Sequence, residues 1–335
     1  MIGRQYFKVA GTGSYLPTTV VSAEEIDSRV GKPIGWTRRR VGVLTRHESP
    51  DRADLTAMAG RAIEAAMTDA GIGWKHIDLV LDCSTTRCRP IPNNASHWLQ
   101  TAGQLAAAIP GMDVQSTCLG FLTALNVVNG LFASGMPYRR VLIVAAEQTM
   151  AGVNWTDAES AALVGDGAAA AIVENVGEVG PLVLAHETFA QHLNLCCVDG
   201  GGHLLPFYEY DASRKGEFLF AMDGKQVFRL ALQRLPPMVE RFVGEATAAG
   251  LGDRDQWQVL PHQASPKALK LMRLALGFSS EQFHCRVAQL GNMAAASMPF
   301  MLDWARREGQ VQSGGTVMLL GTSAGYSQAA MAFRL

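Results

Sequence analysis

The sequence predicts an α/β protein with a five-layered α-β-α-β-α arrangement, built from two pseudo-symmetric halves. Strand and helix patterns alternate along the chain, the strands are almost continuously apolar, and the order of elements in the first half returns in the second. Strands that are apolar on both faces belong to sheets covered by helices on both sides. A chain of 335 residues, 48% of them hydrophobic, is long enough to bury two such cores.

Each half contains an alanine-rich helix that ends at a glycine and is followed by an apolar strand. These three elements lie at 55–69, Gly71 and 77–81, and again at 238–248, Gly250 and 257–260. Glycine is expected there because helices often end in the left-handed conformation, which glycine adopts without strain. The two copies are offset by 179 residues (250 minus 71), so the repeat indicates a duplicated half-fold.

A second set of matching strands follows in each half. These strands are predicted over 140–146 and 167–173 in the first half, and over 316–321 and 327–333 in the second. Counting back from them, the helix that opens at Cys118 matches the helix that opens near Asn292, an offset of 174 (292 minus 118). His262 follows the repeated strand of the second half. Two halves related in this way would bring Cys118, His262 and Asn292 together around a shared centre.

We place the boundary between the halves after residue 180. The N-terminal half, 1–180, then carries Cys118, and the C-terminal half, 181–335, carries the histidine and the asparagine. Two stretches rich in Gly, Pro, Asn or Ser, 83–111 and 181–225, are interpreted as inserted surface connections near the site. The first is a candidate for a pocket wall and a dimer contact.

Cys118 lies between a short apolar stretch and a run of small and apolar residues, a pattern typical of a strand, a tight turn and a helix. At the first turn of a helix a sulfur meets unpaired backbone N–H groups, which favour thiolate over thiol. Free cysteines are also among the most buried residue types, so core packing is the alternative. The adjacent Cys196 and Cys197 are interpreted as structural or incidental.

The composition argues against several classes of protein. A formal net charge of -1 gives no reason to expect a nucleic acid or an anionic membrane as partner. We find no signal peptide and no apolar run long enough to span a bilayer, and therefore expect a cytoplasmic protein. Neither the six cysteines nor the eight histidines show metal-site spacing, so no metal is expected.

The motifs resemble those of the thiolase superfamily and, within it, the ketoacyl-ACP synthase III group. Cys118 lies in TCLGF, His262 in PHQA, and Asn292 in GN before a small-residue helix, contexts similar to those of that group's Cys-His-Asn triad. The likeness also covers GDGAA at 165–169 and MDGKQVF at 222–228, in collinear order over nearly the whole chain. It implies a thiolase-like fold in which both halves are thiolase-like, and it suggests a homodimer.

The resemblance implies a 3-oxoacyl thioester synthase of fatty acid or secondary metabolite biosynthesis. An acyl-CoA would acylate Cys118, and a malonyl thioester on acyl carrier protein (ACP) or CoA would then decarboxylate and condense with the acyl group. His262 and Asn292 would donate hydrogen bonds to the enolate, and asparagine suits this role because its amide donates without titrating. CoA and ACP thioesters would be substrates, and no metal or redox cofactor is needed.

Further site residues are assigned by the resemblance. The backbone N–H groups of Cys118 and Thr322 would form the oxyanion hole, and the substrate-binding residues would be Trp36, Arg40, Lys225, Ser265 and Lys267. Ser265 and Lys225 stand where the family usually has asparagine, and 321–323 replaces three glycines. Because Lys225 could pair with a carboxylate, we expect an acidic, longer or otherwise unusual acyl group.

Two other functions remain open at this point. A non-decarboxylating acyltransferase would use the same acyl-cysteine but pass the acyl group to an alcohol or an amine. A non-catalytic scaffold subunit would pair with an active relative, although such a subunit has no need of all three triad residues.

Overall fold

The computed structural model describes residues 1–49, 51, 54–101, 103 and 108–335. The helices are α1 (Ala23–Arg29), α2 (Trp36–Arg40), α3 (Asp54–Ala70), α4 (Asn94–Thr101), α5 (Gly120–Ala133), α6 (Ala158–Ala161), α7 (Gly224–Ala248), α8 (Pro266–Leu276), α9 (Val287–Leu290) and α10 (Ser297–Arg307). The strands are β1 (Ile2–Tyr15), β2 (Thr19–Ser22), β3 (Thr45–Glu48), β4 (Leu79–Asp82), β5 (Gly111–Asp113), β6 (Arg140–Glu147), β7 (Gly167–Thr188), β8 (Cys196–Cys197), β9 (Ala221–Met222), β10 (Gln258–Pro261), β11 (Thr316–Ser323) and β12 (Ser327–Arg334).

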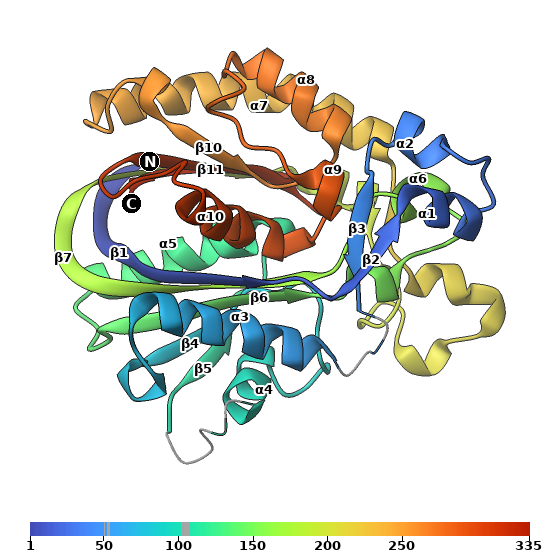
Figure 1. Cartoon of the computed structure of the whole chain (residues 1–335), viewed down its shortest axis with the longest axis horizontal. Coiled ribbons are helices and arrows are strands. Elements are labelled where there is room, and N and C mark those ends of the chain that lie inside the picture. Colours follow the sequence, from blue (N-terminus) through green and yellow to red (C-terminus); the bar gives the residue numbers. More distant parts are fainter. Residues whose placement is uncertain (50, 52–53, 102, 104–107) are drawn as a thin grey trace.

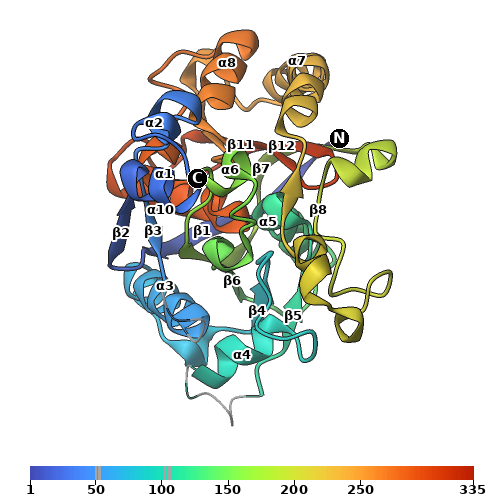
Figure 2. The same ribbon diagram turned by 90° about the vertical axis from the view of Figure 1, so that its right-hand side faces the viewer.

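The main sheet follows the order β10-β11-β12-β7-β6-β4-β5, and β1 pairs with β7. Both β1 and the 22-residue β7 bend around one side of the molecule, so they contribute to an upper and a lower layer of strands (Figure 1). Helices α7 and α8 cover the upper layer, α3 and α4 cover the lower one, and α5 and α10 lie between them (Figures 1 and 2). The predicted five-layered α/β fold is confirmed.

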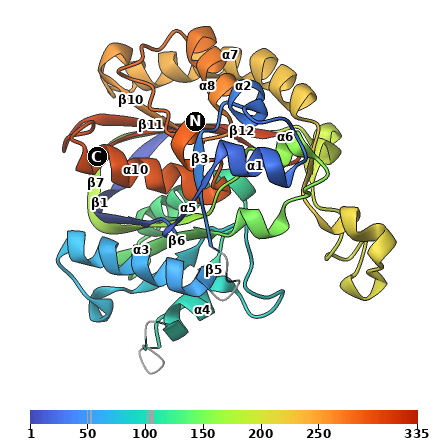
Figure 3. The ribbon, with the colours of Figure 1, turned by 45° about the vertical axis from the view of Figure 1, so that its right-hand side comes forward.

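Strand β7 crosses the boundary that we placed after residue 180. The strand turns where the exposed segment 176–179 lies, and Gly177 there adopts a φ of 73°, a conformation that favours glycine. Residues 181–188 continue the strand, and 183–188 pair with β12, where Val183 is fully buried. The inserted connection expected over 181–225 therefore begins only after Thr188, and it projects from the body of the molecule (Figure 3).

The repeat is visible in the pairing of the strands. β4 and β6 are parallel and β7 is antiparallel to β6, just as β10 and β11 are parallel and β12 is antiparallel to β11. The predicted helix before Gly250 is longer than expected: α7 begins at Gly224 and contains Pro236 and Pro237. Because proline disfavours a helix interior, the pattern of the sequence hid the first part of this helix.

The two central helices correspond at a different offset from the one we predicted. Each is preceded by a 3₁₀ turn, at Thr117–Leu119 and Ala294–Ala296, and the first residue of each turn has a positive φ, 44° and 41°. The offset is 177 (294 minus 117), so the counterpart of Cys118 is Ala295. Matching Cys118 to Asn292 was wrong, because Asn292 still lies in extended backbone that bridges to Val164.

The start of α5 depends on a close approach that only glycine allows. A Cβ on Gly120 would overlap the carbonyl oxygen of Cys83, whereas a Cβ on Gly130 in the same helix would meet nothing within 4 Å. We expect Gly120→Ala to lower the free energy of unfolding by about 1–3 kcal/mol through overpacking. Gly130→Ala, the matched control, is expected to raise it by about 0.5–1 kcal/mol.

Denaturant unfolding of the two variants and the parent protein checks this prediction. Because Gly120 lies just after Cys118, its variant is also expected to lose activity in proportion to the displacement of the turn. Equal stabilities for the two variants would show that the turn has more room than the structure gives it.

Candidate active site

Cys118, His262 and Asn292 line one cavity of about 1630 Å³. Cys118 lies in the turn before α5, His262 follows β10, and Asn292 lies between α9 and α10. The duplicated halves thus bring together three side chains that are far apart in the sequence, as predicted.

Cys118 is held in a constrained turn. Thr117 before it has a φ of 44°, which is uncommon for a residue other than glycine. The Thr117 hydroxyl contacts that of Ser323, and the Ser323 hydroxyl also donates to the Ser116 carbonyl at 2.9 Å. These contacts hold the end of β11 against the turn that carries Cys118.

The sulfur of Cys118 is a thiol at rest. Burial raises its pKa well above the usual range, and the Cys196 thiol and the Glu147 carboxylate act in the same direction. The backbone N–H groups of Cys118 and Ala324 oppose this shift, because they stabilise the anion. The helix-start position was predicted correctly, but the expected preference for thiolate was wrong, since desolvation outweighs the two N–H groups.

Two backbone N–H groups approach the sulfur of Cys118, its own and that of Ala324. Strand β11 continues to Ser323, so Thr322 still lies in the sheet opposite Gln328. Thr322 lines the cavity, and its role in the oxyanion hole stays a prediction.

His262 is buried, with a side chain in close contact with β11. The residue is 4% exposed, and its backbone N–H donates to the Leu320 carbonyl at 2.8 Å. The ring nitrogen Nδ1 has no hydrogen-bond partner among the described residues. A Cβ on Gly321 would lie 2.8 Å from the Cβ of His262, so the glycine makes room for the histidine. Burial lowers the pKa of His262 to about 4. At neutral pH the imidazole is therefore an uncharged donor.

The low pKa of His262 predicts a contribution to the pH dependence of stability. The unfolded chain takes up a proton near pH 6.5, while the folded protein does so only near pH 4. The unfolded state therefore binds more protons in this window, and His262 destabilises the fold by about 3 kcal/mol as pH falls from 6.5 to 4. We expect His262→Gln to lose less stability than the parent over this window in urea unfolding. Parallel curves for the two proteins would contradict the assigned pKa.

Asn292 is oriented by its neighbours. Its side-chain oxygen accepts the Ala294 N–H at 2.9 Å. Its backbone N–H donates to the Leu163 carbonyl at 2.8 Å, and its backbone carbonyl accepts the Gly165 N–H at 3.1 Å. Because the amide oxygen is already engaged, the NH₂ group is the part of the side chain left for the cavity. Asn292 is thus presented as a donor that does not titrate.

The expected substrate-binding residues are only partly brought together. Arg40, Lys225, Ser265 and Lys267 line the cavity, whereas Trp36 is absent from its lining. Instead, the ring of Trp36 packs against the small cluster of apolar residues that includes Val21 and Ile26, beside the ammonium group of Lys32.

Three of these residues already have partners. Arg40 is paired with Glu159 at 2.7 Å, and Lys267 donates to the carbonyls of Arg39 and Arg40 at the end of α2. Ser265 caps α8 by accepting the Ala268 N–H. Lys225 has no ion pair or side-chain hydrogen bond within the described residues, so it is the most available of the group.

The sequence did not single out Cys196 and Glu147, which also belong to the cavity. Cys196 lines it, and its carbonyl accepts the Gly325 N–H at 2.8 Å, next to the Ala324 N–H that points at Cys118. Glu147 also lines it, and burial raises the pKa of this carboxyl group to about 7. Neither residue lies in a recognisable motif, since both reach the cavity through tertiary packing.

Comparison with known proteins identifies the family of the chain. The model of 3-oxoacyl-[acyl-carrier-protein] synthase III matches residues 112–191, and the model of the C-terminal part of that enzyme matches residues 246–335. The beta-ketoacyl-[acyl-carrier-protein] synthase III of Neisseria meningitidis serogroup C is 30% identical over 330 residues, covering 98% of both chains. The chain belongs to this family.

Two solved structures of synthases share the fold. 3-Oxoacyl-(acyl carrier protein) synthase III of Pseudomonas aeruginosa PAO1 has a TM-score of 0.84 and 26% identity, and each chain is covered to 98%. The priming β-ketosynthase of the R1128 polyketide pathway has the same TM-score and 30% identity, with 99% of this chain and 97% of the other covered. The chain is therefore an enzyme of the condensing, acyl-transferring kind. In the part of the chain that the structure describes, no helix is both long and apolar enough to cross a bilayer.

Proposed function

We propose that this synthase makes 3-oxoacyl thioesters in two stages, with Cys118 as the nucleophile. In the first stage the sulfur attacks the carbonyl carbon of an acyl-CoA, the N–H groups of Cys118 and Thr322 hold the oxyanion, and CoA leaves as a thiol with the proton of Cys118. The thiol is protonated at rest, and His262 is the neutral base in the same cavity. The product of this stage is an acyl-Cys118 thioester and free CoA.

In the second stage a malonyl thioester, on ACP or CoA, loses carbon dioxide. The electron pair of the broken carbon–carbon bond forms an enolate, whose oxygen accepts hydrogen bonds from His262 and Asn292. The enolate carbon attacks the acyl carbonyl, and Cys118 leaves as a thiolate that takes up a proton from solvent. The two proposed stages need no cofactor, and CoA and ACP act only as carriers of the substrates.

The observation that carries this proposal is the pairing of two uncharged donors with one nucleophile. His262 is kept neutral by burial, and the oxygen of Asn292 is engaged by Ala294, so both side chains offer N–H groups within the cavity that holds Cys118. Such donors stabilise a developing oxyanion without neutralising it by proton transfer. A scaffold subunit would gain nothing from this arrangement.

We propose that the reaction starts an acyl chain in fatty acid or secondary metabolite biosynthesis, and that it takes place in the cytoplasm. The family's match to acyl-carrier-protein synthases and the likeness to a priming ketosynthase support it. Lys225 and Lys267 place positive charge on the cavity lining, beside the Arg40–Glu159 ion pair, which suits the phosphates of CoA or of an ACP-bound pantetheine arm. We further propose a homodimer in which 83–111 contributes to the contact.

The release of labelled carbon dioxide tests the reaction. The enzyme is mixed with an acyl-CoA and carboxyl-labelled malonyl-CoA or malonyl-ACP, and carbon dioxide and the 3-oxoacyl product are measured together. Equal amounts of both, dependent on both substrates, are expected. Transfer of the acyl group to an alcohol or an amine without carbon dioxide would contradict decarboxylation and favour the acyltransferase alternative.

A further inference from the structure

Gln263 is a fully buried residue whose side-chain amide uses all of its hydrogen-bonding capacity inside the protein. Its Nε2 group donates to the Pro261 carbonyl at 2.8 Å and to the His284 carbonyl at 3.2 Å. Its Oε1 atom accepts the backbone N–H groups of Arg286 at 2.7 Å and Val287 at 3.0 Å. An amide has two N–H donors and two acceptor lone pairs, so these four contacts engage all of them.

The two N–H groups that Gln263 accepts belong to the start of α9. The first N–H groups of a helix have no acceptor within the helix itself. Within the described part of the chain, the side chain of Arg286, which precedes α9, caps none of them. Gln263 supplies the acceptor from a different part of the chain. Because Gln263 directly follows His262, it connects the histidine loop to the start of α9.

Helix α9 leads directly to Asn292. The helix is followed by Gly291, which has a φ of 69°, and a Cβ there would lie 2.8 Å from the Val164 carbonyl oxygen. Asn292 itself is hydrogen-bonded to the same neighbouring segment, at Leu163 and Gly165. One turn of helix and one glycine separate the start of α9 from Asn292, so a displacement of that start is passed on to the asparagine.

The segment that enters β3 supports α9 independently of Gln263. The Leu44 N–H donates to the Ala288 carbonyl at 2.7 Å, and the Thr45 hydroxyl donates to the Gln289 carbonyl at 3.0 Å. Loss of the Gln263 contacts should therefore leave α9 folded but able to shift relative to the histidine loop.

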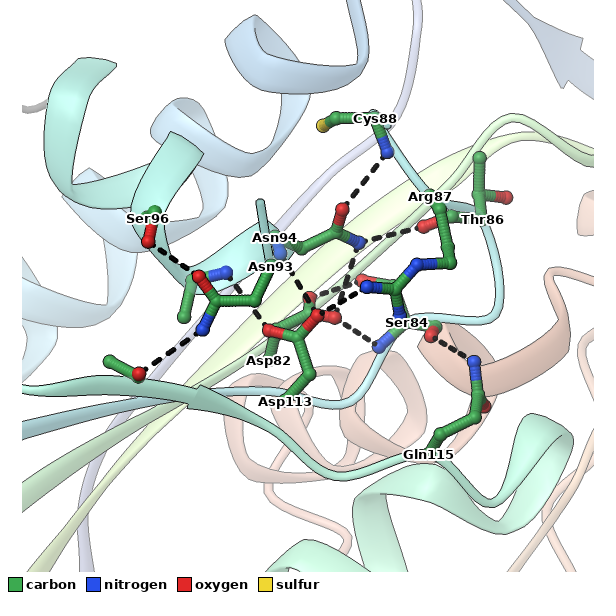
Figure 4. A network of polar contacts seen from close by, with 12 residues as sticks. Asp82, Ser84, Thr86, Arg87, Cys88, Asn93, Asn94, Ser96, Asp113 and Gln115 are labelled. Carbon is green, nitrogen blue, oxygen red and sulfur yellow. Dashed lines mark hydrogen bonds and ion pairs between the residues drawn. The ribbon is translucent and has the colours of Figure 1, made fainter. Parts of the chain in front are cut away.

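The first half of the fold makes the corresponding link with another glutamine. Strands β4 and β10 match at an offset of 179, so the counterpart of Gln263 is Ser84 (263 minus 84). The Ser84 carbonyl accepts the side chain of Gln115 at 3.2 Å (Figure 4), and that side chain also accepts the Thr117 N–H at 2.8 Å, just before Cys118. In each half, one glutamine thus connects the segment after a strand to the segment that carries a residue of the triad.

We infer that Gln263 is a positioning residue for the condensation stage, where it sets the placement of Asn292 relative to His262. One of the two proposed enolate donors is its neighbour in the chain, and the other follows the helix that it holds. The turn of Cys118 has its own support in the first half, so acylation should not depend on Gln263. This inference rests on the proposed function, since it concerns the second of the two stages.

Gln263→Met tests the inference. Methionine has nearly the length and shape of glutamine but forms none of the four hydrogen bonds. We expect condensation to fall by about 10–100-fold while acylation of Cys118 stays within about 2-fold of the parent rate, because only the enolate donors are displaced. Mass spectrometry of the intact protein follows acylation, carbon dioxide release follows condensation, and thermal unfolding checks that the variant is folded.

Gln263→Glu separates hydrogen bonding from packing. Its carboxyl group can still accept the N–H groups of Arg286 and Val287. If these contacts place Asn292, this variant should retain more condensation than Gln263→Met, although methionine is better suited to a buried position. A more active methionine variant would overturn the inference, since the side chain would then only fill space.

The matched control is Asn94→Leu. Asn94 is likewise fully buried, and its amide accepts the Cys88 N–H at 2.9 Å and donates to the Thr86 carbonyl at 2.8 Å and to the Asp82 carboxylate at 3.2 Å (Figure 4). These partners lie at the end of β4 and in the loop after it, not at α9. We expect this variant to lose stability, as the methionine variant does, with no fall in condensation relative to acylation.

A double variant shows whether Gln263 acts through Asn292. Adding Gln263→Met to Asn292→Asp is expected to lower condensation by less than about 3-fold, because the donor that Gln263 places is already lost. Losses that multiply in the double variant would contradict this route.

Failure of the inference can be distinguished from failure of the proposed function. If Gln263→Met leaves condensation unchanged or slows acylation equally, or if Asn94→Leu lowers condensation relative to acylation to the same extent, the inference is overturned while the two-stage reaction stands. If the parent enzyme forms no acyl-Cys118 or releases no carbon dioxide, both fail.

Discussion

Replacing Cys118 by alanine is expected to lower condensation by at least about 10³-fold, because no other group can hold the acyl chain between the two stages. The alanine fits the space of the thiol, so the fold and the binding of CoA should persist. Product formation from acyl-CoA and malonyl thioester is the measurement. No acyl-enzyme should form in this variant during any residual turnover.

The matched control is Cys285→Ala. Cys285 is an exposed free cysteine that does not line the cavity, and its variant is expected to retain the activity of the parent. Retained condensation in Cys118→Ala, with a loss in Cys285→Ala, would contradict the assignment of the nucleophile.

Changing Asn292 to aspartate is expected to separate the two stages. The new carboxylate can still accept the Ala294 N–H, so the loop should keep its conformation. It can no longer donate to the enolate, and its negative charge opposes the one that develops there. Removal of one oxyanion donor lowers rates by about 10²–10³-fold, so condensation should fall by at least this factor while acylation of Cys118 stays close to the parent rate.

Mass spectrometry of the acyl-enzyme and carbon dioxide release measure the two stages separately. Asn126→Asp on the exposed side of α5 is the control for the added charge, and no change in either stage is expected. If Asn292→Asp slowed acylation as much as condensation, the asparagine would act on the first oxyanion or on the fold instead of on the enolate.

Much of the fold followed from the sequence because the repeat is a local pattern. Apolar strands, helices and terminal glycines are set by neighbouring residues, and their order in the two halves was sufficient to bring Cys118, His262 and Asn292 to one place. The offset between the halves was wrong by three residues (177 minus 174). Extended backbone at Asn292 depends on its bridge to Val164, a contact that no local pattern reveals.

The electrostatics of the site could not be predicted in the same way. A helix start favours a thiolate, but the pKa of Cys118 is decided by how much water its surroundings exclude. The Ala324 N–H reaches the sulfur just after β11 ends at Ser323, whose hydroxyl contacts Ser116 and Thr117 from the other half of the chain. Similarly, the four hydrogen bonds of Gln263 exist only in the packed protein.

The acyl-enzyme is the central claim, and peptide mass spectrometry tests it most directly. After incubation with a panel of mono- and dicarboxylic acyl-CoA esters, the peptide that contains Cys118 is expected to gain the mass of one acyl group. Addition of malonyl thioester should return it to its original mass, with one carbon dioxide released for each acyl group lost. An unmodified Cys118 peptide across the whole panel, or an acyl group that malonyl thioester does not discharge, would contradict the account.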